Sequence, residues 1–399
     1  MSRSAPVAVT GAGCICAAGA TLPGCVESMF GGSRQPLPPV RFSTGHSVKY
    51  PVFEVPEEFF PPELPEDERL SRTSRLAIAA TMEALGDAGL DLVQLRSMRV
   101  GVCIGTTVGS AMNNEEFYRE YRRGGRPDMS PIERFLRSNP AASVARHFGL
   151  TGPVQTVVNA CASGTDAIGV AASWIRGGLC DIALAGGADE LCRVTYNGFI
   201  SLMISSNEPV RPFDLDRKGL NLGEGAAVMV LETDNVVEGR KRKKRSWVLG
   251  YGSSCDAYHL TAPKPDGAGL RQAIREAMDA GGCKPDEIAF VNAHGTGTPD
   301  NDRVEGRVIA EILPDIPFLS TKGFTGHTLG AAGAIEAAFT VACLEAGRVP
   351  ASIGFETTDP EVSARPVTET TTVNGGVAIS QSLAFGGNNA VIVLGKGER

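Results

Sequence analysis

The sequence predicts an α/β protein made of two successive halves that share one alternation of strands and helices. Short runs rich in β-branched residues alternate with longer segments rich in alanine and leucine, an order typical of sheets that helices cover on both faces. Glycine makes up 48 of the 399 residues, well above the usual share of about 7%. Because these glycines lie within apolar segments, we interpret them as tight turns and close contacts between helices and sheets.

The first half begins with a strand that runs into a glycine turn. We expect its strands at residues 7–13, 99–109, 154–160, 181–189 and 226–232. Apolar residues at helical spacing predict helices at residues 74–90 and 164–178. The proline-rich segment 31–66 is expected to be irregular, and segment 125–140 is expected to be a surface insertion.

The second half repeats this rhythm. We expect its strands at residues 247–255, 288–295, 318–322, 375–387 and 389–395. Helices are expected at residues 267–282 and 330–347. The repetition suggests an internal duplication, with an N-terminal half at residues 1–245 and a C-terminal half at residues 246–399.

Composition excludes several classes of protein. The formal net charge of −7 argues against a general affinity for nucleic acid, so we interpret the basic run Arg240–Arg245 as a solvated helix end or linker. No run of 18 apolar residues predicts a membrane span, and Thr10, Gly11 and Gly13 interrupt the apolar start of the chain. The ten cysteines include no Cys-x-x-Cys pair and form no disulfide framework. A cytoplasmic protein with free thiols is therefore expected.

Cys161 is the cysteine whose sequence context favours chemistry. It stands where a β-branched run ends and a helix begins, in VQTVVNACASGTDAIG at residues 154–169. The exposed amides of a helix N-terminus favour a thiolate there, and the small residues that follow leave room for a substrate. A free cysteine also packs readily as a small hydrophobic side chain, so the choice depends on partners elsewhere in the chain.

Two of the five histidines are suited to be those partners. His294 and His327 each follow a predicted strand or its turn, in VNAHGTGTPD and STKGFTGHTLGAAG. Such turns present side chains at the carboxyl edge of a sheet, where sites in α/β proteins form. Histidine is the usual acid–base or electrophilic partner of a nucleophile. One such histidine is more often structural, but two of them together with Cys161 favour an active site.

Four sequence blocks around these residues are NACASGTDAIG, NAHGTGTPDNDRVE, STKGFTGHTLGAAGAIEA and SLAFGGNNAVIVL. In this order they resemble the motifs of the β-ketoacyl-acyl carrier protein synthases of the elongating Cys-His-His type. RPFDLDRKGLNLGEGAAVMVLE and DAYHLTAPKPDGAG are also similar to that family, so the resemblance runs nearly end to end.

The resemblance implies a thiolase fold, in which duplicated halves pack as a five-layer α-β-α-β-α sandwich and the chain forms a homodimer. It implies the decarboxylative condensation of an acyl-enzyme thioester with malonyl-acyl carrier protein in fatty acid elongation. The acyl carrier protein would be the partner, with no nucleic acid and no membrane involved. No cofactor is expected, because the phosphopantetheine arm belongs to the carrier.

The resemblance also implies a role for each reacting group. Cys161 would accept the acyl group, and the backbone amides of Cys161 and Phe385 would form the oxyanion hole. His294 and His327 would bind the malonyl thioester carbonyl and promote decarboxylation. Two imidazoles that donate to one thioester oxygen would stabilise the enolate formed when carbon dioxide leaves.

Further residues are expected around these groups. Lys322 is expected beside Glu305, as a charge pair that organises the site. Substrate-binding roles fall to Thr296 and Thr298 on the phosphopantetheine arm, Phe385 and Gly386 at the gate of the acyl pocket, and Val108 in its wall.

Two charged features carry weaker expectations. The acidic carrier is expected to dock on the basic residues Arg69, Arg72 and Arg75, which could instead serve only solubility. Glu336 stands on an otherwise apolar helix, so its carboxylate must be paired or bind an ion. The family suggests a structural cation near Glu336, and a buried salt bridge is the alternative.

Departures from the family pattern concern substrate length and gating. Asn388 stands where threonine is usual, Asp300 and Asn301 stand where Leu-Gly is usual, and Ala384 replaces a common glycine. None of these changes removes a catalytic group.

Alternatives remain within the same chemistry. A ketosynthase of a type II polyketide or polyene pathway would use the same residues with another carrier protein. A non-catalytic chain-length partner subunit is disfavoured because such subunits lack the nucleophile. A thiolase is disfavoured by Phe385, which stands where thiolases have a second cysteine, and an initiating synthase by His327, where those enzymes have asparagine.

Overall fold

The computed structural model describes residues 4–64, 70–109, 114–137 and 139–397. Ten strands are hydrogen-bonded side by side in the order β3-β2-β4-β5-β1-β6-β12-β11-β7-β8. These strands are β1 (Val7–Cys16), β2 (Val100–Gly105), β3 (Val154–Val157), β4 (Ile182–Asp189), β5 (Gly225–Glu232), β6 (Ser246–Cys255), β7 (Ile288–Asn292), β8 (Phe318–Leu319), β11 (Val377–Ala384) and β12 (Asn388–Lys396). The short strands β9 (Arg348–Val349) and β10 (Thr371–Thr372) pair separately.

The sheet order divides into two five-stranded sheets with one topology. The first runs β3-β2-β4-β5-β1 and the second runs β8-β7-β11-β12-β6. In each sheet the first three strands are parallel and the last two pair antiparallel. Among the described residues, the short pairing of β1 with β6, at Val7–Val9 and Ser246–Val248, is the only strand pairing that joins the two sheets. This repeated topology is the internal duplication that the sequence rhythm suggests.

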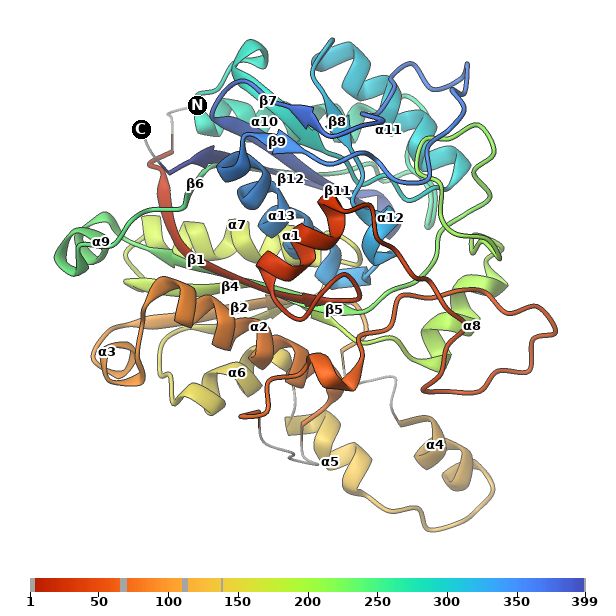
Figure 1. Ribbon diagram of the computed structural model, residues 1–399. Coiled ribbons are helices and arrows are strands. Elements are labelled where there is room, and N and C mark those ends of the chain that lie inside the picture. The colour runs from red at the N-terminus through yellow and green to blue at the C-terminus, as the bar shows by residue number, and fades with distance from the viewer. Residues whose placement is uncertain (1–3, 65–69, 110–113, 138, 398–399) are drawn as a thin grey trace.

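Helices complete a five-layer arrangement (Figure 1). The helices are α1 (Leu22–Phe30), α2 (Arg72–Ala88), α3 (Leu92–Arg96), α4 (Glu115–Arg122), α5 (Ser130–Arg137), α6 (Pro140–Phe148), α7 (Ser163–Arg176), α8 (Arg193–Ser201), α9 (Asp234–Arg240), α10 (Ala268–Gly281), α11 (Pro299–Ile312), α12 (Lys322–Thr325) and α13 (Ala332–Ala346). α2 and α6 cover the outer face of the first sheet, and α10 and α11 cover that of the second. α7 and α13 lie between the sheets in the largest apolar core. The five-layer prediction is confirmed.

Glycines in equivalent strands let the outer helices approach closely. A Cβ at Gly13 of β1 would lie 2.2 Å from the Ala80 carbonyl oxygen of α2, and one at Gly252 of β6 would lie 2.2 Å from the Ala273 carbonyl oxygen of α10. No side chain fits at such distances. Part of the glycine excess is therefore explained by helix–sheet packing, as the sequence indicated.

The surface insertion differs from the one expected. It begins before residue 125, because α4 and α5 together project from the body of the protein (Figure 1). It also ends before Pro140, because α6 packs against the first sheet with Pro140, Val144 and Phe148 buried. The helices α1, α3, α4, α5, α6, α8, α9, α11 and α12 were not predicted. In α11, polar residues dominate the first two turns, which hides its helical periodicity.

The basic run Arg240–Arg245 begins at the last residue of α9 and leads into β6, as expected for a helix end or linker. Arg240 pairs with Glu232, Lys244 with Asp234, and Arg245 with Asp87 and Glu345. Among the described residues, segment Leu329–Ala346 is long and apolar enough to cross a membrane by composition, but it is 89% buried inside the protein. It contains α13, the central helix between the two sheets.

Candidate active site

Cys161 lies in a tight turn between β3 and α7. Ala160 before it has a φ of 46°, a left-handed conformation that is strained for a non-glycine residue. The Ala162 amide donates to the Asn159 carbonyl at 3.1 Å, and the Ser163 amide donates to the Ala160 carbonyl at 3.2 Å. Ser163 Oγ also donates to the Ala160 carbonyl at 2.6 Å. These bonds hold the strained turn, and the turn places Cys161 in the wall of a cavity.

The two predicted histidines meet Cys161 from the second half. The ring centroids of His294 and His327 lie 5.2 Å apart, and Cys161 Sγ and one nitrogen of each ring all lie within 4.8 Å of one another. His294 follows β7 and His327 follows α12. The turns after β7, β8 and β11 converge because these three strands are parallel and end at one edge of the sheet.

Hydrogen bonds fix the tautomer of both histidines. The Leu329 amide donates to His327 Nδ1 at 3.1 Å, and Lys322 Nζ donates to His294 Nδ1 at 3.0 Å. A neutral imidazole that accepts at Nδ1 carries its proton on Nε2. Burial, reinforced by the charge of Lys322, lowers the pKa of both imidazoles well below the usual value. Both side chains are therefore neutral Nε2–H donors at pH 7.

The expected pairing of Lys322 with Glu305 is wrong. Lys322 Nζ forms its ion pair with Glu336 Oε1 of α13 and donates to the His294 carbonyl at 2.6 Å. Glu305, on α11, instead accepts from the backbone amides of His294 at 2.6 Å and Gly295 at 2.8 Å. These two amides follow β7, so they lack strand partners and take a carboxylate from the next helix. Glu305 supports the His294 turn, while Glu336 holds Lys322.

One cavity of about 360 Å³ contains the site. Its lining includes Cys161, Phe199, Met203, His259, His294, Thr296, Thr298, Asp300, Asn301, His327, Ala384 and Phe385. A larger surface hollow of about 580 Å³ near β8 is lined by residues such as Leu313 and Arg365 and by no cysteine or histidine. The smaller cavity is therefore the candidate site.

The gate region carries most of the departures from the family pattern. The backbone amide of Phe385 acts on the Cys161 thiol and lowers its pKa, against the larger effect of burial. The Phe385 ring stacks on Phe199, with centroids 5.7 Å apart. Asn388 Nδ2 donates to the Phe385 carbonyl at 3.2 Å, so this departure fastens the gate segment.

Four predicted binding residues have different positions relative to the cavity. Thr296 and Thr298 line it and lie 2.8 Å apart between their hydroxyl oxygens. Gly386 is not among the lining residues, although its neighbours Phe385 and Gly387 are. Val108 packs against the neighbouring apolar cluster around Tyr196 rather than facing this cavity.

The thiolate-favouring effect expected from the helix N-terminus does not dominate at Cys161. Burial raises the pKa of the Cys161 thiol to about 11, although Lys322 and the Phe385 amide act in the opposite direction. Cys161 directly precedes Ala162, the N-cap residue of α7, so the helix field acts on its thiol, but burial has the larger effect. Cys161 therefore rests as a thiol.

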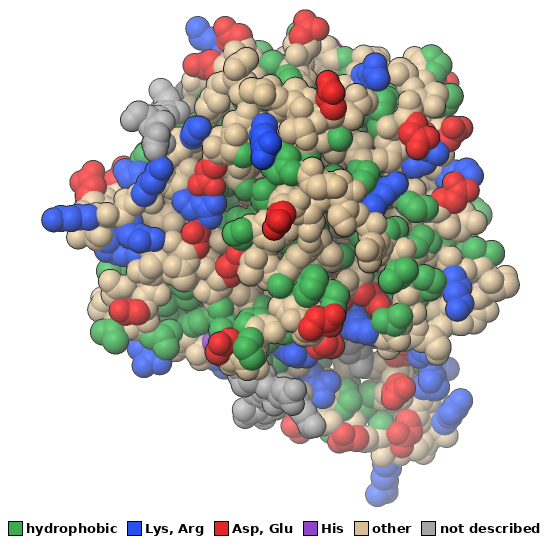
Figure 2. Space-filling view, in the orientation of Figure 1, with side chains coloured by type: hydrophobic (Ala, Val, Ile, Leu, Met, Phe, Trp, Pro, Cys, Tyr) green, Lys and Arg blue, Asp and Glu red, His purple; other side chains and the backbone are tan. Residues whose placement is uncertain are grey.

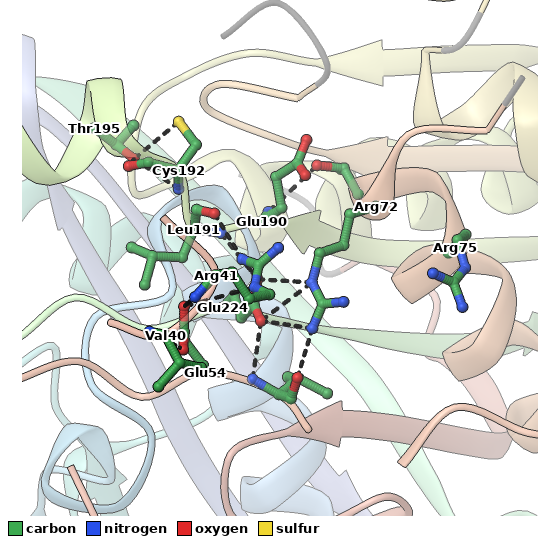
Figure 3. Close-up of polar contacts among 12 residues, drawn as sticks. Val40, Arg41, Glu54, Arg72, Arg75, Glu190, Leu191, Cys192, Thr195 and Glu224 are labelled. Atoms are coloured by element: carbon green, nitrogen blue, oxygen red, sulfur yellow. Dashed lines mark hydrogen bonds and ion pairs between the residues drawn. The ribbon is translucent and has the colours of Figure 1, made fainter. Parts of the chain in front are cut away.

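Arg72 is not available to dock a carrier protein. Its side chain is 8% exposed and its guanidinium lies 2.8 Å from Glu224 (Figure 3). Removing the charge of Arg72 from water is compensated by this buried carboxylate, so the residue ties α2 to the start of β5. Arg75 stands apart from Glu224 in Figure 3, and its guanidinium lies 3.5 Å from Glu57, so its docking role stays a prediction. Arg69 lies outside the described residues.

Oxygen atoms near Glu336 fit the suggested cation. Glu336 Oε2 and Asn292 Oδ1 are buried and have no hydrogen-bond partner among the described residues. Asn292 Nδ2 donates to the Glu336 carbonyl at 3.0 Å, so the two residues are adjacent. Such an oxygen-only donor set suits a hard cation. The alternative, a salt bridge, is also present through Lys322, and the cation stays a prediction.

Asp189 is a site-supporting residue that sequence analysis missed. Its carboxylate accepts from Thr106 Oγ1 at 2.6 Å and from the amides of Thr107 at 2.7 Å and Gly330 at 2.6 Å. It therefore joins the segment after β2 to the turn that follows His327. A carboxylate that ends a buried strand was the available signal, because such a group must find several donors.

Comparisons with known proteins agree with this geometry. Residues 4–236 match the β-ketoacyl synthase N-terminal domain, and residues 245–356 match the β-ketoacyl synthase C-terminal domain. A 3-oxoacyl-[acyl-carrier-protein] synthase 2 from Synechocystis sp. is 35% identical over 345 residues, which cover 83% of each chain.

Solved structures extend the likeness over the whole fold. The ishigamide ketosynthase/chain length factor superposes with a TM-score of 0.92 at 33% identity, over 99% of this chain and 100% of that chain. A type II polyketide synthase ketosynthase, solved in complex with its acyl carrier protein, gives a TM-score of 0.88 at 27% identity, over 99% of this chain and 100% of that chain. The resemblance seen in the motifs and the thiolase fold are both confirmed, and the chain belongs to the β-ketoacyl synthase family.

Proposed function

We propose that the protein is a 3-oxoacyl-acyl carrier protein synthase that condenses an acyl group on Cys161 with malonyl-acyl carrier protein in fatty acid elongation. The observation that carries the proposal is the convergence of one thiol and two neutral Nε2–H donors in a single cavity. A neutral donor pair suits an oxygen that becomes negative during reaction, because it stabilises the charge without first binding a proton.

Acyl transfer uses the buried thiol. Cys161 sulfur attacks the acyl thioester carbonyl, and the amides of Cys161 and Phe385 hold the resulting oxyanion. The C–S bond to the pantetheine sulfur then breaks. The proton lost by Cys161 ends on that sulfur, so the transfer consumes no net base. The influence of the Phe385 amide on the Cys161 thiol, whose pKa it lowers, supports this role.

Decarboxylation and condensation use the two histidines. The malonyl thioester oxygen accepts hydrogen bonds from His294 and His327, and the carboxylate leaves as carbon dioxide. The electrons of the broken C–C bond form an enolate, whose carbon attacks the acyl-Cys161 carbonyl. The intermediate collapses to a β-ketoacyl-carrier thioester, and the Cys161 thiolate takes up one proton. Lys322 is a positioning residue here, because it holds the His294 tautomer.

Partners follow from this chemistry. The carrier protein brings both the acyl and the malonyl groups on its phosphopantetheine arm, so we propose no cofactor of the enzyme itself and a cytoplasmic location. Basic and acidic side chains intermingle on the face seen in Figure 2, so this face as a whole does not attract an acidic carrier. Docking there would require a small area in which basic side chains predominate. Arg75 remains our candidate for that area.

A homodimer is the proposed assembly. β3 is an edge strand, because β2 is its only sheet neighbour among the described strands. It exposes Val158 just beyond its end to 67% and Val154 to 43%. An unpaired strand edge with exposed valines is a template for pairing with another chain. If β3 of one copy paired with β3 of a second copy, the β3-β2-β4-β5-β1 sheets of the two copies would join into one sheet.

A second candidate pathway has specific support. Three proteins of similar structure are an ishigamide ketosynthase/chain length factor, a type II polyketide synthase ketosynthase bound to a hexaketide, and a ketosynthase in complex with its chain length factor. The same Cys161 chemistry would then serve a polyketide or polyene chain, with a related subunit in place of the second copy.

Intact-protein mass spectrometry with acyl carrier thioesters of several lengths tests the proposal. Wild type should gain one acyl group that malonyl carrier discharges as a β-ketoacyl product, and Cys161→Ala should gain none. A single condensation with saturated acyl donors would support fatty acid elongation. Product formation only with a co-expressed partner subunit would support the second pathway, and the absence of any adduct would overturn both.

A further inference from the structure

A cluster of three buried cysteines lies outside the active site. Cys14 and Cys16 are alternate residues of β1 and therefore point to the same face, and Cys25 lies on α1. All three belong to the core between the sheets, and their sulfur atoms lie within 4.8 Å of one another. The Cys16 and Cys25 sulfurs are in hydrogen-bond contact at 3.5 Å.

Metal binding and disulfide formation are the two kinds of chemistry that suit three neighbouring thiols, and the charge of the surroundings distinguishes between them. A metal ion bound by three thiolates would carry net negative charge into an apolar core, which is strongly unfavourable without a compensating cation. The nearby Glu83 offers no compensation, because it is itself acidic and accepts from the Cys14 amide at 2.8 Å. A disulfide is neutral and leaves the core apolar. The surroundings therefore favour oxidation over metal binding.

One of the three sulfurs is prepared to react. Interactions with the Cys14 and Cys25 thiols and with the backbone at Ala18 and Gly19 lower the pKa of Cys16 well below its usual value. The thiolate is the nucleophilic form of cysteine. The adjoining turn is exposed at Ala20 and Thr21, so local opening of this turn would admit a small oxidant.

We propose that Cys16 and Cys25 form an oxidisable dithiol that a peroxide converts to a disulfide. The Cys16 thiolate attacks one peroxide oxygen, the O–O bond breaks, and Cys16 becomes a sulfenic acid while water forms. The Cys25 sulfur then attacks the Cys16 sulfur, the S–O bond breaks, and the second water leaves with the proton of Cys25. The bond ties the end of β1 to α1, which packs against α13, and Cys14 remains a thiol.

Peptide mapping after peroxide treatment tests this proposal without depending on condensing activity. The experiment uses full-length Cys161→Ala protein, so that oxidation of Cys161 cannot contribute. After treatment with hydrogen peroxide, the protein is alkylated under denaturing conditions and digested with trypsin. The three cysteines share the tryptic peptide 4–34, and Cys103 lies alone in peptide 100–119. Cys103 is the matched control, because it is also fully buried.

After oxidation, peptide 4–34 is expected to have lost two hydrogens and to carry one alkyl group, on Cys14. When the protein is reduced before alkylation, the same peptide should carry three alkyl groups. Peptide 100–119 should remain fully alkylated. Cys14→Ser should still form the bond, and Cys25→Ser should not. The melting temperature of the Cys14→Ser protein should rise on oxidation and fall again on reduction. Three alkyl groups on peptide 4–34 after treatment, sulfinic acid at Cys16, or a Cys14–Cys16 bond would overturn the proposal.

Discussion

Replacing His327 with alanine should slow decarboxylation far more than acyl transfer. The site offers two neutral Nε2–H donors to one thioester oxygen, and the fixed tautomers mean that neither donor can substitute for the other. Loss of one donor from a buried oxyanion site costs about 3–4 kcal/mol. Since about 1.4 kcal/mol corresponds to tenfold in rate, the enolate-forming step should slow about 100- to 1,000-fold.

Acyl transfer should be nearly unchanged in this variant. In the proposed mechanism its oxyanion is held by the backbone amides of Cys161 and Phe385, which a change at position 327 does not remove. The two half-reactions are measured separately, as formation of the acyl adduct by intact mass and as carbon dioxide release from malonyl carrier on the acylated enzyme. His147→Ala is the control, because His147 is exposed at the end of α6.

Two results would refute the reasoning. Equal loss of acyl transfer and decarboxylation would mean that His327 acts on both oxyanions or supports the fold. A decarboxylation rate within about tenfold of wild type would mean that His294 alone stabilises the enolate.

Three further predictions test the frame around the site. Lys322→Met should lower the free energy of unfolding, measured in urea, by about 3–5 kcal/mol because it strands a buried Glu336; adding Glu336→Gln should restore most of that stability without restoring condensation, and no recovery would contradict the pairing. Gly252→Ala should lower the melting temperature, because its Cβ would lie 2.2 Å from a carbonyl oxygen of α10, at a cost of about 1–3 kcal/mol or more. Gly86→Ala in α2, where a Cβ meets nothing within 4 Å, should instead stabilise by up to about 1 kcal/mol, and equal effects would refute the packing argument. Burial raises the pKa of Glu83 from 4.5 to about 7, so the folded protein holds this proton more tightly and stability should fall as pH rises from about 5 to 8, by up to about 3 kcal/mol. Glu83→Gln should flatten that dependence in urea titrations at several pH values, and an unchanged slope would count against it.

Sequence patterns predicted the strands of the two sheets well, because the spacing of apolar residues along a segment depends on whether that segment is a strand or a helix. They were weaker where contacts join distant segments. Lys322 and Glu305 stand in neighbouring motifs, so their pairing was a reasonable expectation, yet α13 brings Glu336 to the ammonium instead. Similarly, a helix start near Cys161 suggested a thiolate, but the pKa depends on burial by segments from both halves. Arg72 was interpreted as a surface cation because its buried partner, Glu224, lies far away in the sequence.

The duplicated fold explains how a thiol from one half meets histidines from the other. α7 and α13 hold equivalent positions between the sheets, and their first turns cross in direct contact. A Cβ at Gly164 of α7 would lie 2.8 Å from the Ala334 amide nitrogen, and one at Gly333 of α13 would lie 2.1 Å from Thr165 Oγ1. These glycines set the separation of the helix starts, since any side chain there would push the helices apart. Cys161 precedes one start and His327 the other, so the close crossing of two duplicated helices holds the Cys161 thiol beside the His327 imidazole.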